Sequence, residues 1–357
     1  MDVTKIQFFF FGCWNDGSCK NNVFLNNIIK SIKSCSDLYD FGVILGDNIY
    51  PEVIDKKKHY IETLKSGIEC INSINKPLYI VLGNHDVTQC DIITEQARNN
   101  KNWNFEKNFY ALTFERSNVS VKLIVIDTNL LADDKIYRSI FMDEQQELPC
   151  KLPPTINTNY DDMIRFLKRE LKTANKYNWV IVAGHEPIAS FKEKKNSTKP
   201  IANPKINLMV ELLGSIPNLI YICADTHNFQ YNTISNGSSN ITQIVSGTGG
   251  ATPDQILPIY KDNKFHDIDG IHKIIMHDTY TPYGYSDMII MKEKIVIMYR
   301  QIFPSFQEHL FVIELPPRTD DISADAQQGS GNFFYFKKYL KYKTKYLEKR
   351  TRINYYN

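Results

Sequence analysis

Hydrophobic and polar positions follow two periods in the first quarter of the chain. Short apolar runs of strand-forming residues occupy positions 6–11, 41–45 and 77–82. Between them, positions 23–35 and 56–75 carry apolar residues at helical spacing. Strands that alternate with helices in this way predict βαβ units and a largely parallel core, so the expected fold class is α/β.

Later segments extend this pattern and then depart from it. Positions 109–114 and 119–128 resemble a hairpin, and 160–175 and 206–214 read as helices that precede strands at 178–183 and 218–223. Runs at 242–246, 286–291, 294–301 and 311–315 predict a second, more antiparallel sheet packed on the first. Positions 90–105, 132–160 and 192–205 are polar and are expected to be loops.

The C-terminal part differs in composition from the rest. Residues 316–332 are polar and small, which predicts a linker after a domain of residues 1–315. Residues 333–357 form a basic segment rich in Tyr and Lys, in which one helical face carries Tyr335, Tyr339, Tyr342 and Tyr346. Two interpretations remain open: this helix docks on its own domain, or it binds a protein partner or an anionic surface.

Composition excludes several classes of protein. The 357 residues are 43% hydrophobic and 23% charged, as in soluble globular proteins, and a net charge of +2 gives no reason to expect nucleic acid as a partner. Since no apolar run reaches about 18 residues, no transmembrane segment is expected. The first apolar run is too short for a secretory signal. Seven cysteines at irregular spacing predict free thiols in a reducing, intracellular compartment.

Residues that can bind metals follow five of the predicted strands. Because parallel strands open their carboxyl ends on one side of a sheet, these residues can converge. Thiol, carboxylate, imidazole, amide and phenol groups suit borderline or hard cations. The candidates are Cys13 with Asn15, Asp47 with Tyr50, Asn84 with His85, His185, and Asp225 with His227.

Four blocks of sequence resemble those of a known family. They are Gly46-Asp47-Asn48-Ile49-Tyr50, Gly83-Asn84-His85-Asp86, Gly184-His185-Glu186-Pro187 and the segment 225–231. In this order they resemble calcineurin-type metallophosphoesterases, and Tyr50 is similar to the small purple acid phosphatases in particular. The resemblance runs from about residue 6 to about residue 303, with support from 126–128 and 245–251. It implies a four-layer αββα sandwich of two mixed β-sheets flanked by helices.

The resemblance also implies roles for these residues. Asp47 would bridge two metal ions, Tyr50 and His227 would complete the first site, and Asn84 and His185 would belong to the second. The ions implied are iron, zinc or manganese. His85 would contact the substrate, as would Asn84. It would protonate the leaving oxygen or hydrogen-bond the phosphate, while a metal-bound hydroxide attacks phosphorus.

Two positions depart from the family pattern. Cys13 stands where the family has Asp in the first site, and Asp225 stands where it has His in the second. Both can still bind metals. Because a thiolate is a softer ligand, we expect zinc or ferrous iron here rather than a stable ferric–phenolate centre. Asn15 or Asp16 could lend an oxygen instead, and Cys13 could be a buried thiol with no chemical role.

Two functions therefore remain in view, and a nucleotide or phosphodiester hydrolase would differ from the first of them only in its substrate. The first is a metal-dependent phosphatase that hydrolyses phosphate monoesters at a dinuclear site with the altered ligands Cys13 and Asp225. The alternative is a catalytically inactive, purple-acid-phosphatase-like scaffold. The Lys/Tyr-rich tail is similar to C-terminal tails of proteins from giant DNA viruses of amoebae, which would make this a viral protein of the host cytoplasm or the virion.

Overall fold

The computed structural model describes residues 4–17, 19, 22–51, 59–98, 101–132, 152–192, 199–258, 260 and 264–314. The chain divides into one unit of Met1–Leu315 and another of Pro316–Asn357. The second unit lies outside the described residues, and so do the predicted linker and tail helix. Most of the predicted loop at 132–160 lies outside them as well.

The first sheet joins parallel and antiparallel strands. Its order is β17-β16-β15-β1-β2-β3-β4. Strands β1 to β4 are parallel, whereas β15, β16 and β17 pair antiparallel with their neighbours. The strands are β1 (Ile6–Phe11), β2 (Phe41–Ile44), β3 (Leu78–Ile80), β4 (Trp103–Asn104), β15 (Gly284–Ile290), β16 (Lys294–Gln301) and β17 (Gln307–Glu314).

The second sheet is also mixed, with the order β13-β14-β11-β12-β10-β7-β6-β5. Strands β6, β7, β10 and β12 are parallel, and the others pair antiparallel. The strands are β5 (Tyr110–Arg116), β6 (Val119–Val125), β7 (Trp179–Ala183), β10 (Leu219–Cys223), β11 (Phe229–Ser235), β12 (Asn240–Ser246), β13 (Phe265–Asp267) and β14 (Lys273–Tyr280). A small antiparallel pair, β8 (Ala189–Ser190) and β9 (Ile201–Ala202), stands apart.

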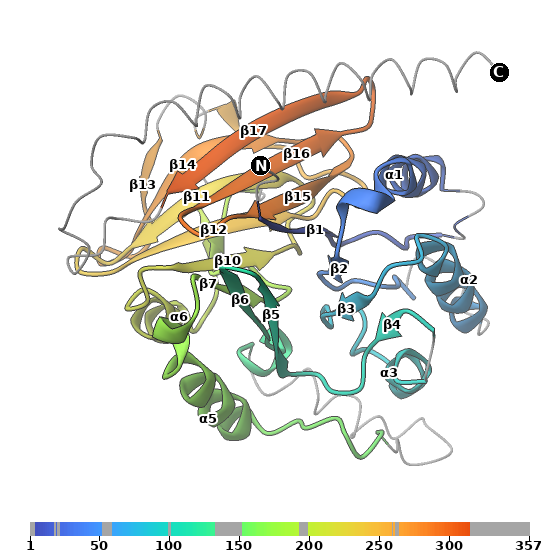
Figure 1. Ribbon diagram of the computed structural model, residues 1–357, viewed down its shortest axis with the longest axis horizontal. Coiled ribbons are helices and arrows are strands. Elements are labelled where there is room, and N and C mark those ends of the chain that lie inside the picture. Colours follow the sequence, from blue (N-terminus) through green and yellow to red (C-terminus); the bar gives the residue numbers. More distant parts are fainter. Residues whose placement is uncertain are drawn as a thin grey trace. The chain divides into compact units, whose positions relative to one another are not determined.

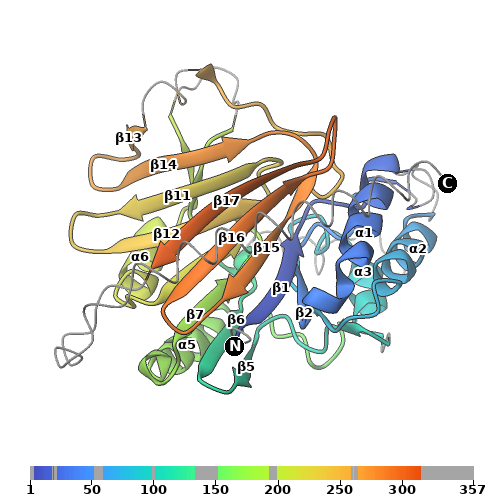
Figure 2. The ribbon, with the colours of Figure 1, turned by 45° about the horizontal axis from the view of Figure 1, so that its top comes forward.

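Helices cover the outer faces of the two sheets. Figures 1 and 2 show α1 (Val23–Ser34), α2 (Tyr60–Asn72) and α3 (Cys90–Gln96) beside β1 and β2, and α5 (Tyr160–Leu171) and α6 (Ile206–Leu213) beside the second sheet. Asn22 caps α1 by accepting a hydrogen bond from the Leu25 N–H, and Asn159 caps α5 in the same way. The predicted four-layer sandwich of two mixed sheets is confirmed. Short 3-10 turns lie at Ser36–Leu38, Thr128–Leu130 and Ala174–Lys176.

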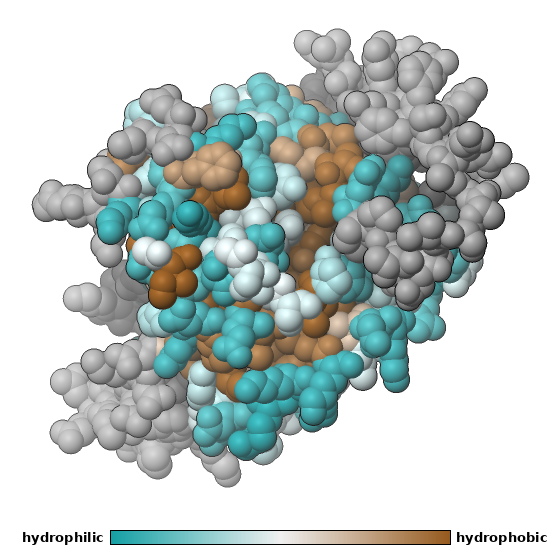
Figure 3. Space-filling model, turned by 90° about the vertical axis from the view of Figure 1, so that its left-hand side faces the viewer, coloured by the Kyte–Doolittle hydropathy of each residue, from teal (hydrophilic) through white to brown (hydrophobic). Residues whose placement is uncertain are grey.

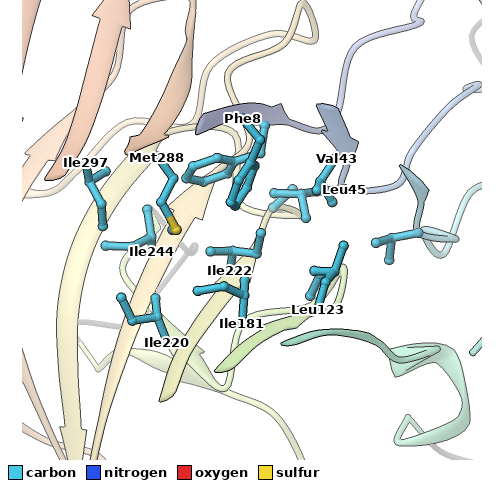
Figure 4. Close-up of a cluster of buried hydrophobic side chains, with 14 of the residues drawn as sticks. Phe8, Val43, Leu45, Leu123, Ile181, Ile220, Ile222, Ile244, Met288 and Ile297 are labelled. Atoms are coloured by element: carbon cyan, nitrogen blue, oxygen red, sulfur yellow. The ribbon is translucent and has the colours of Figure 1, made fainter. Parts of the chain in front are cut away.

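The main core fills the space between the two sheets. Because successive residues of a strand point to opposite faces, alternate residues of β1, β7, β10 and β15 meet there. Figure 4 shows Phe8 and Met288 of the first sheet facing Ile181, Ile222 and Ile244 of the second. All five side chains are 0–1% exposed, so the sandwich holds the strand ends in fixed positions.

The topology differs from the sequence prediction in one respect. Strands β15, β16 and β17 extend the sheet that contains β1, whereas β12 joins β10, so the antiparallel strands do not form a sheet of their own. Periodicity identifies a strand but carries no information about its neighbours. Positions 90–105 were expected to be a loop and contain α3 instead, and strands β11, β13 and β14 were missed because their alternation is partly polar.

The prediction of free thiols is wrong for three of the described cysteines. Cys19 and Cys70 form a disulfide that ties the loop after β1 to α2, and Cys90 is also disulfide-bonded. Cys13, Cys35 and Cys223 are free and buried. Irregular spacing hid the pairing because it depends on contacts between distant segments. Across the described residues, no helix combines the length and apolar character needed to cross a membrane.

Apolar residues also reach the surface. Phe265 in β13 and Ile271 in the connection between β13 and β14 are 65% and 63% exposed. Figure 3 views the side of the molecule that lies at the left of Figure 1 and shows a band of hydrophobic residues between hydrophilic regions. Large apolar side chains are therefore not confined to the interior of the sandwich.

Candidate metal centre

The predicted ligands follow strands of both sheets. Strands β1, β2 and β3 of the first sheet lead to Cys13, Asp47 and Asn84, and strands β7 and β10 of the second lead to His185 and Asp225. The sequence predicted all five groups of candidate ligands at the strand ends of one sheet. Two parallel sets of strands instead end at the same edge of the sandwich, and their loops meet there.

Close packing of two glycines brings the loops after β2 and β3 together. A Cβ on Gly83 would lie 2.2 Å from both the backbone N and the Oδ1 of Asp47, and one on Gly46 would lie 2.6 Å from the ring of His185. Gly46 also has a φ of +89°. Only glycine fits at these two positions, so Gly46 and Gly83 allow the loops that carry Asp47 and Asn84 to pack directly against each other.

Three of the predicted ligands adopt the left-handed backbone region that non-glycine residues rarely occupy. Cys13, Asp47 and Asp225 have φ values of 57°, 51° and 54°. Such conformations cost about 1–3 kcal/mol each and persist where the surrounding structure enforces them. A hydrogen bond from the Cys13 N–H to Gly46 O, 3.0 Å long, contributes to that enforcement. This concentration of strain at three candidate ligands is typical of a functional site.

Cys13, Asp47 and His185 form the buried part of the site. Their ligand atoms all lie within 4.8 Å of one another. The two oxygens of Asp47 face different neighbours: Oδ2 lies 3.8 Å from Cys13 Sγ, and Oδ1 lies 3.2 Å from His185 Nε2. The carboxylate of Asp47 is therefore oriented to serve two groups of ligands.

One of those groups surrounds His185. Its Nδ1–H donates to Leu45 O at 2.7 Å, so in the neutral ring the lone pair is on Nε2. Three acceptor oxygens of the described residues lie around Nε2: Asn84 Oδ1 at 3.1 Å, Asp47 Oδ1 at 3.2 Å and Asp225 Oδ1 at 3.8 Å. Lone pairs that converge on one point in this way fit a cation.

The other group contains Tyr50 and His227. The hydroxyl of Tyr50 lies 3.2 Å from His227 Nε2, and the Nδ1–H of His227 donates to Thr252 O at 2.8 Å. His227 thus presents Nε2 to the site, as His185 does. The half-buried His85 ring lies 4.6 Å from that of Tyr50, and its backbone N–H donates to Asp47 Oδ1 at 3.3 Å. All eight residues of the predicted site are therefore neighbours.

Electrostatic interactions favour positive charge at this point. Burial alone would raise the pKa of Asp47, but His185 and His85 outweigh it and lower the pKa to about 2. Burial alone would lower the pKa of His185, and Asp47 and Asp225 reverse this and raise it. Burial, followed by the charges of Asp47 and Asp225, raises the pKa of the Cys13 thiol well above its usual value. Without a cation, the thiol and the imidazole therefore both hold protons.

The side chains of the alternative oxygen donors make contacts elsewhere, although Asn15 Oδ1 is buried without a hydrogen-bond partner among the described residues. The Asn15 amide donates to Asn48 O at 2.8 Å and lies against α2, where a Cβ on Gly67 would approach it within 2.6 Å. Asp16 accepts a hydrogen bond from Asn22. Trp14 is fully buried and donates to Asn48 Oδ1. Cys13, which points toward Asp47, is thus the group that the loop after β1 offers to the site.

A buried polar network behind the site was missed by sequence reasoning. The Asp86 carboxylate accepts hydrogen bonds from the backbone N–H groups of Gly83 and Asn48 and from the side chains of Asn48 and Gln96. Burial, and then the charge of Asp47, raises the pKa of Asp86 to about 8. Asp86 joins the loops after β2 and β3. Its place in the block Gly83-Asn84-His85-Asp86 was the available signal.

Sequence comparison decides the family. The family model described as calcineurin-like phosphoesterase matches residues 8–214, which is more than half of the chain. The chain belongs to the calcineurin-like phosphoesterase family. Among proteins with curated descriptions, none is significantly similar to it.

Solved structures with a similar fold agree with this family assignment. GAP50, "the anchor in the inner membrane complex of Plasmodium", has a TM-score of 0.58 at 16% identity, over 89% of this chain and 91% of that one. The purple acid phosphatase PPD1 of yellow lupin seeds has a TM-score of 0.59 at 13% identity, over 92% of this chain and 58% of that one. PhoD has a TM-score of 0.54 at 13% identity, over 92% and 73%. At such identities the likeness concerns the fold alone.

Proposed function

We propose that this phosphoesterase is a metal-dependent phosphatase that hydrolyses phosphate monoesters with the altered ligands Cys13 and Asp225. The observation that carries the proposal is the convergence of acceptor atoms on His185 Nε2, together with the two-sided orientation of Asp47. Membership of the calcineurin-like phosphoesterase family supports the reaction class.

The donor set divides into two groups that share Asp47. Cys13, Tyr50 and His227 would hold one cation with Asp47 Oδ2, and Asn84, His185 and Asp225 would hold a second with Asp47 Oδ1. Iron, zinc or manganese fits these donors, and the thiol of Cys13 favours zinc or ferrous iron. When bound, two such cations activate water and neutralise the charge that develops on a transferring phosphoryl group.

The protein's own residues supply position and protons. His85 and Asn84 are half-buried, as Asp225 and His227 are, so a substrate can contact them from solvent. We assign to His85 the protonation of the leaving oxygen, because its backbone is hydrogen-bonded to Asp47 while its ring packs against Tyr50. Tyr50 and Asp47, which are 4% and 1% exposed, keep the inner part of the site dry.

The test is hydrolysis of p-nitrophenyl phosphate by the full chain loaded with zinc, ferrous iron or manganese. Asn84→Ala should lower kcat/KM by about 10²–10³-fold, the range for losing one group that stabilises transition-state charge. Asn240→Ala is the matched control, since Asn240 is exposed at the far end of β12 from the site. No turnover with any of the three metals would exclude the proposal.

A second candidate is a catalytically inactive scaffold. It is favoured by the likeness to GAP50, which covers nearly the whole of both chains and concerns a protein described as an anchor. The departures at Cys13 and Asp225 point the same way, because a protonated thiol is a poor ligand. The double variant Cys13→Asp with Asp225→His separates the two: it should raise a weak activity, whereas a scaffold would gain none.

A further inference from the structure

Lys192 carries a positive charge near the candidate metal centre. It belongs neither to the predicted ligands nor to the four blocks of sequence that resemble the family. Lys192 follows β8 and lies in the stretch 192–205, which was interpreted from sequence as a charged surface loop. Its side chain is only 33% exposed. Partial burial of a charged lysine is unfavourable unless an oppositely charged or hydrogen-bonding partner compensates for the lost hydration.

The backbone before Lys192 is fixed to the loop that carries the ligands Asp225 and His227. Ser190 Oγ and Thr226 Oγ1 are 2.8 Å apart, and both residues are buried. Phe191 O accepts hydrogen bonds from the side chains of Asn228 and Gln230, at 3.3 Å and 2.7 Å, and the Phe191 N–H donates to Gln230 Oε1 at 3.0 Å. These hydrogen bonds hold the backbone immediately before Lys192 in a fixed position.

Asp254 links Lys192 to the metal centre. Asp254 Oδ2 accepts a hydrogen bond from the His227 N–H at 2.9 Å and lies 3.5 Å from Lys192 Nζ. Burial alone would lower the pKa of Lys192, but Asp225 and Asp254, in that order, outweigh it and raise the pKa. The ammonium therefore stays charged and lies within the field of Asp225 as well as that of Asp254.

We propose that Lys192 is an anion-binding residue of this site that holds a non-bridging oxygen of the substrate's phosphate group. Its charge offsets that of Asp225, which adds a negative charge at the place where an anionic substrate must approach. Asp254 orients the ammonium, and an ammonium has three donors, so one partner leaves it able to donate to a phosphate oxygen. This proposal rests on the proposed phosphatase function.

The experiment measures binding of inorganic phosphate to the metal-loaded full chain by titration calorimetry. Lys192→Gln should weaken phosphate binding by about ten- to hundredfold, the range for one hydrogen bond between charged groups. Lys192→Arg should restore most of it. Lys205→Gln is the matched control, because Lys205 is an exposed lysine beyond β9 whose Nζ faces the Tyr160 ring, and it should bind phosphate like the wild type.

Metal content of each variant distinguishes the outcomes. Lys192→Gln should keep the wild-type metal content, since removing a positive charge cannot weaken the hold on a cation. If it keeps its metals and binds phosphate as tightly as the wild type, the role of Lys192 is overturned and the phosphatase proposal stands. Loss of metal in Lys192→Gln would also overturn it, because Lys192 would then be a structural support. A metal-loaded wild type that binds no phosphate would overturn both.

Discussion

Replacing Gly83 by alanine should destroy the metal centre through a single added methyl group. The new Cβ would lie 2.2 Å from Asp47 N and Oδ1, whereas Cβ atoms essentially never approach other atoms closer than 3.0 Å. Asp47 must therefore move by about 0.8 Å, which exceeds the tolerance of about 0.2 Å for metal–ligand distances. The φ of Gly83 is not positive, so the effect is steric and not conformational.

The cost to stability should stay moderate. Overpacking of a buried site costs about 1–3 kcal/mol, and replacing glycine by alanine in an allowed conformation returns about 0.4–1 kcal/mol through the unfolded chain. We therefore expect Gly83→Ala to fold, to lose about 1–2 kcal/mol of unfolding free energy in urea, and to lose most of its metal by elemental analysis.

Gly17→Ala is the matched control. Gly17 lies in the loop after β1, has no positive φ, and has nothing within 4 Å of an added Cβ. This variant should be as stable as the wild type or more stable by up to about 1 kcal/mol, and it should keep the wild-type metal content. A folded Gly83→Ala protein with the full metal content of the wild type would refute the reasoning, because it would mean that Asp47 need not hold the position described.

Three further predictions concern the same region. Bound cations should dissociate as the pH falls, because the raised pKa of His185 lets a proton compete with the cation for Nε2. The apparent affinity for the metal should drop about tenfold per pH unit. Metal retention that does not depend on pH would argue against His185 as a ligand. Cys19→Ser should cost up to about 4 kcal/mol in non-reducing urea unfolding, since the disulfide closes a loop of 51 residues; an unchanged midpoint would speak against the bond. Purified protein should have no strong visible phenolate-to-iron band, and such a band, abolished in Tyr50→Phe, would show that Cys13 does not prevent a ferric centre.

The sequence predicted the convergence of the candidate side chains better than the topology around them. Asp47, Asn84, His185 and Asp225 each follow an apolar strand, and the rule that parallel strands open on one side brought them together without any knowledge of sheet order. The assignment of β15, β16 and β17 to a separate sheet failed, because the pairing of β1 with β15 joins residues more than 270 positions apart and leaves no local signal.

Residues that act through tertiary contacts could not be identified in advance. Asp86 is the last residue of the block Gly83-Asn84-His85-Asp86, but its role depends on the approach of Asn48 and Gln96 from other segments. Lys192 belongs to a run of lysines whose composition is that of an exposed loop. Its position follows from the hydrogen bonds of Gln230 to the backbone at Phe191, which periodicity does not encode.

Elemental analysis of the full chain, purified without added metal, tests the central claim most directly. If the two groups of donors that share Asp47 hold cations, the protein should contain about two metal ions per chain, with zinc or iron as the main elements. Asp47→Asn should reduce both together. Metal at background level in the wild type, unchanged after incubation with zinc, ferrous iron and manganese, would contradict the account.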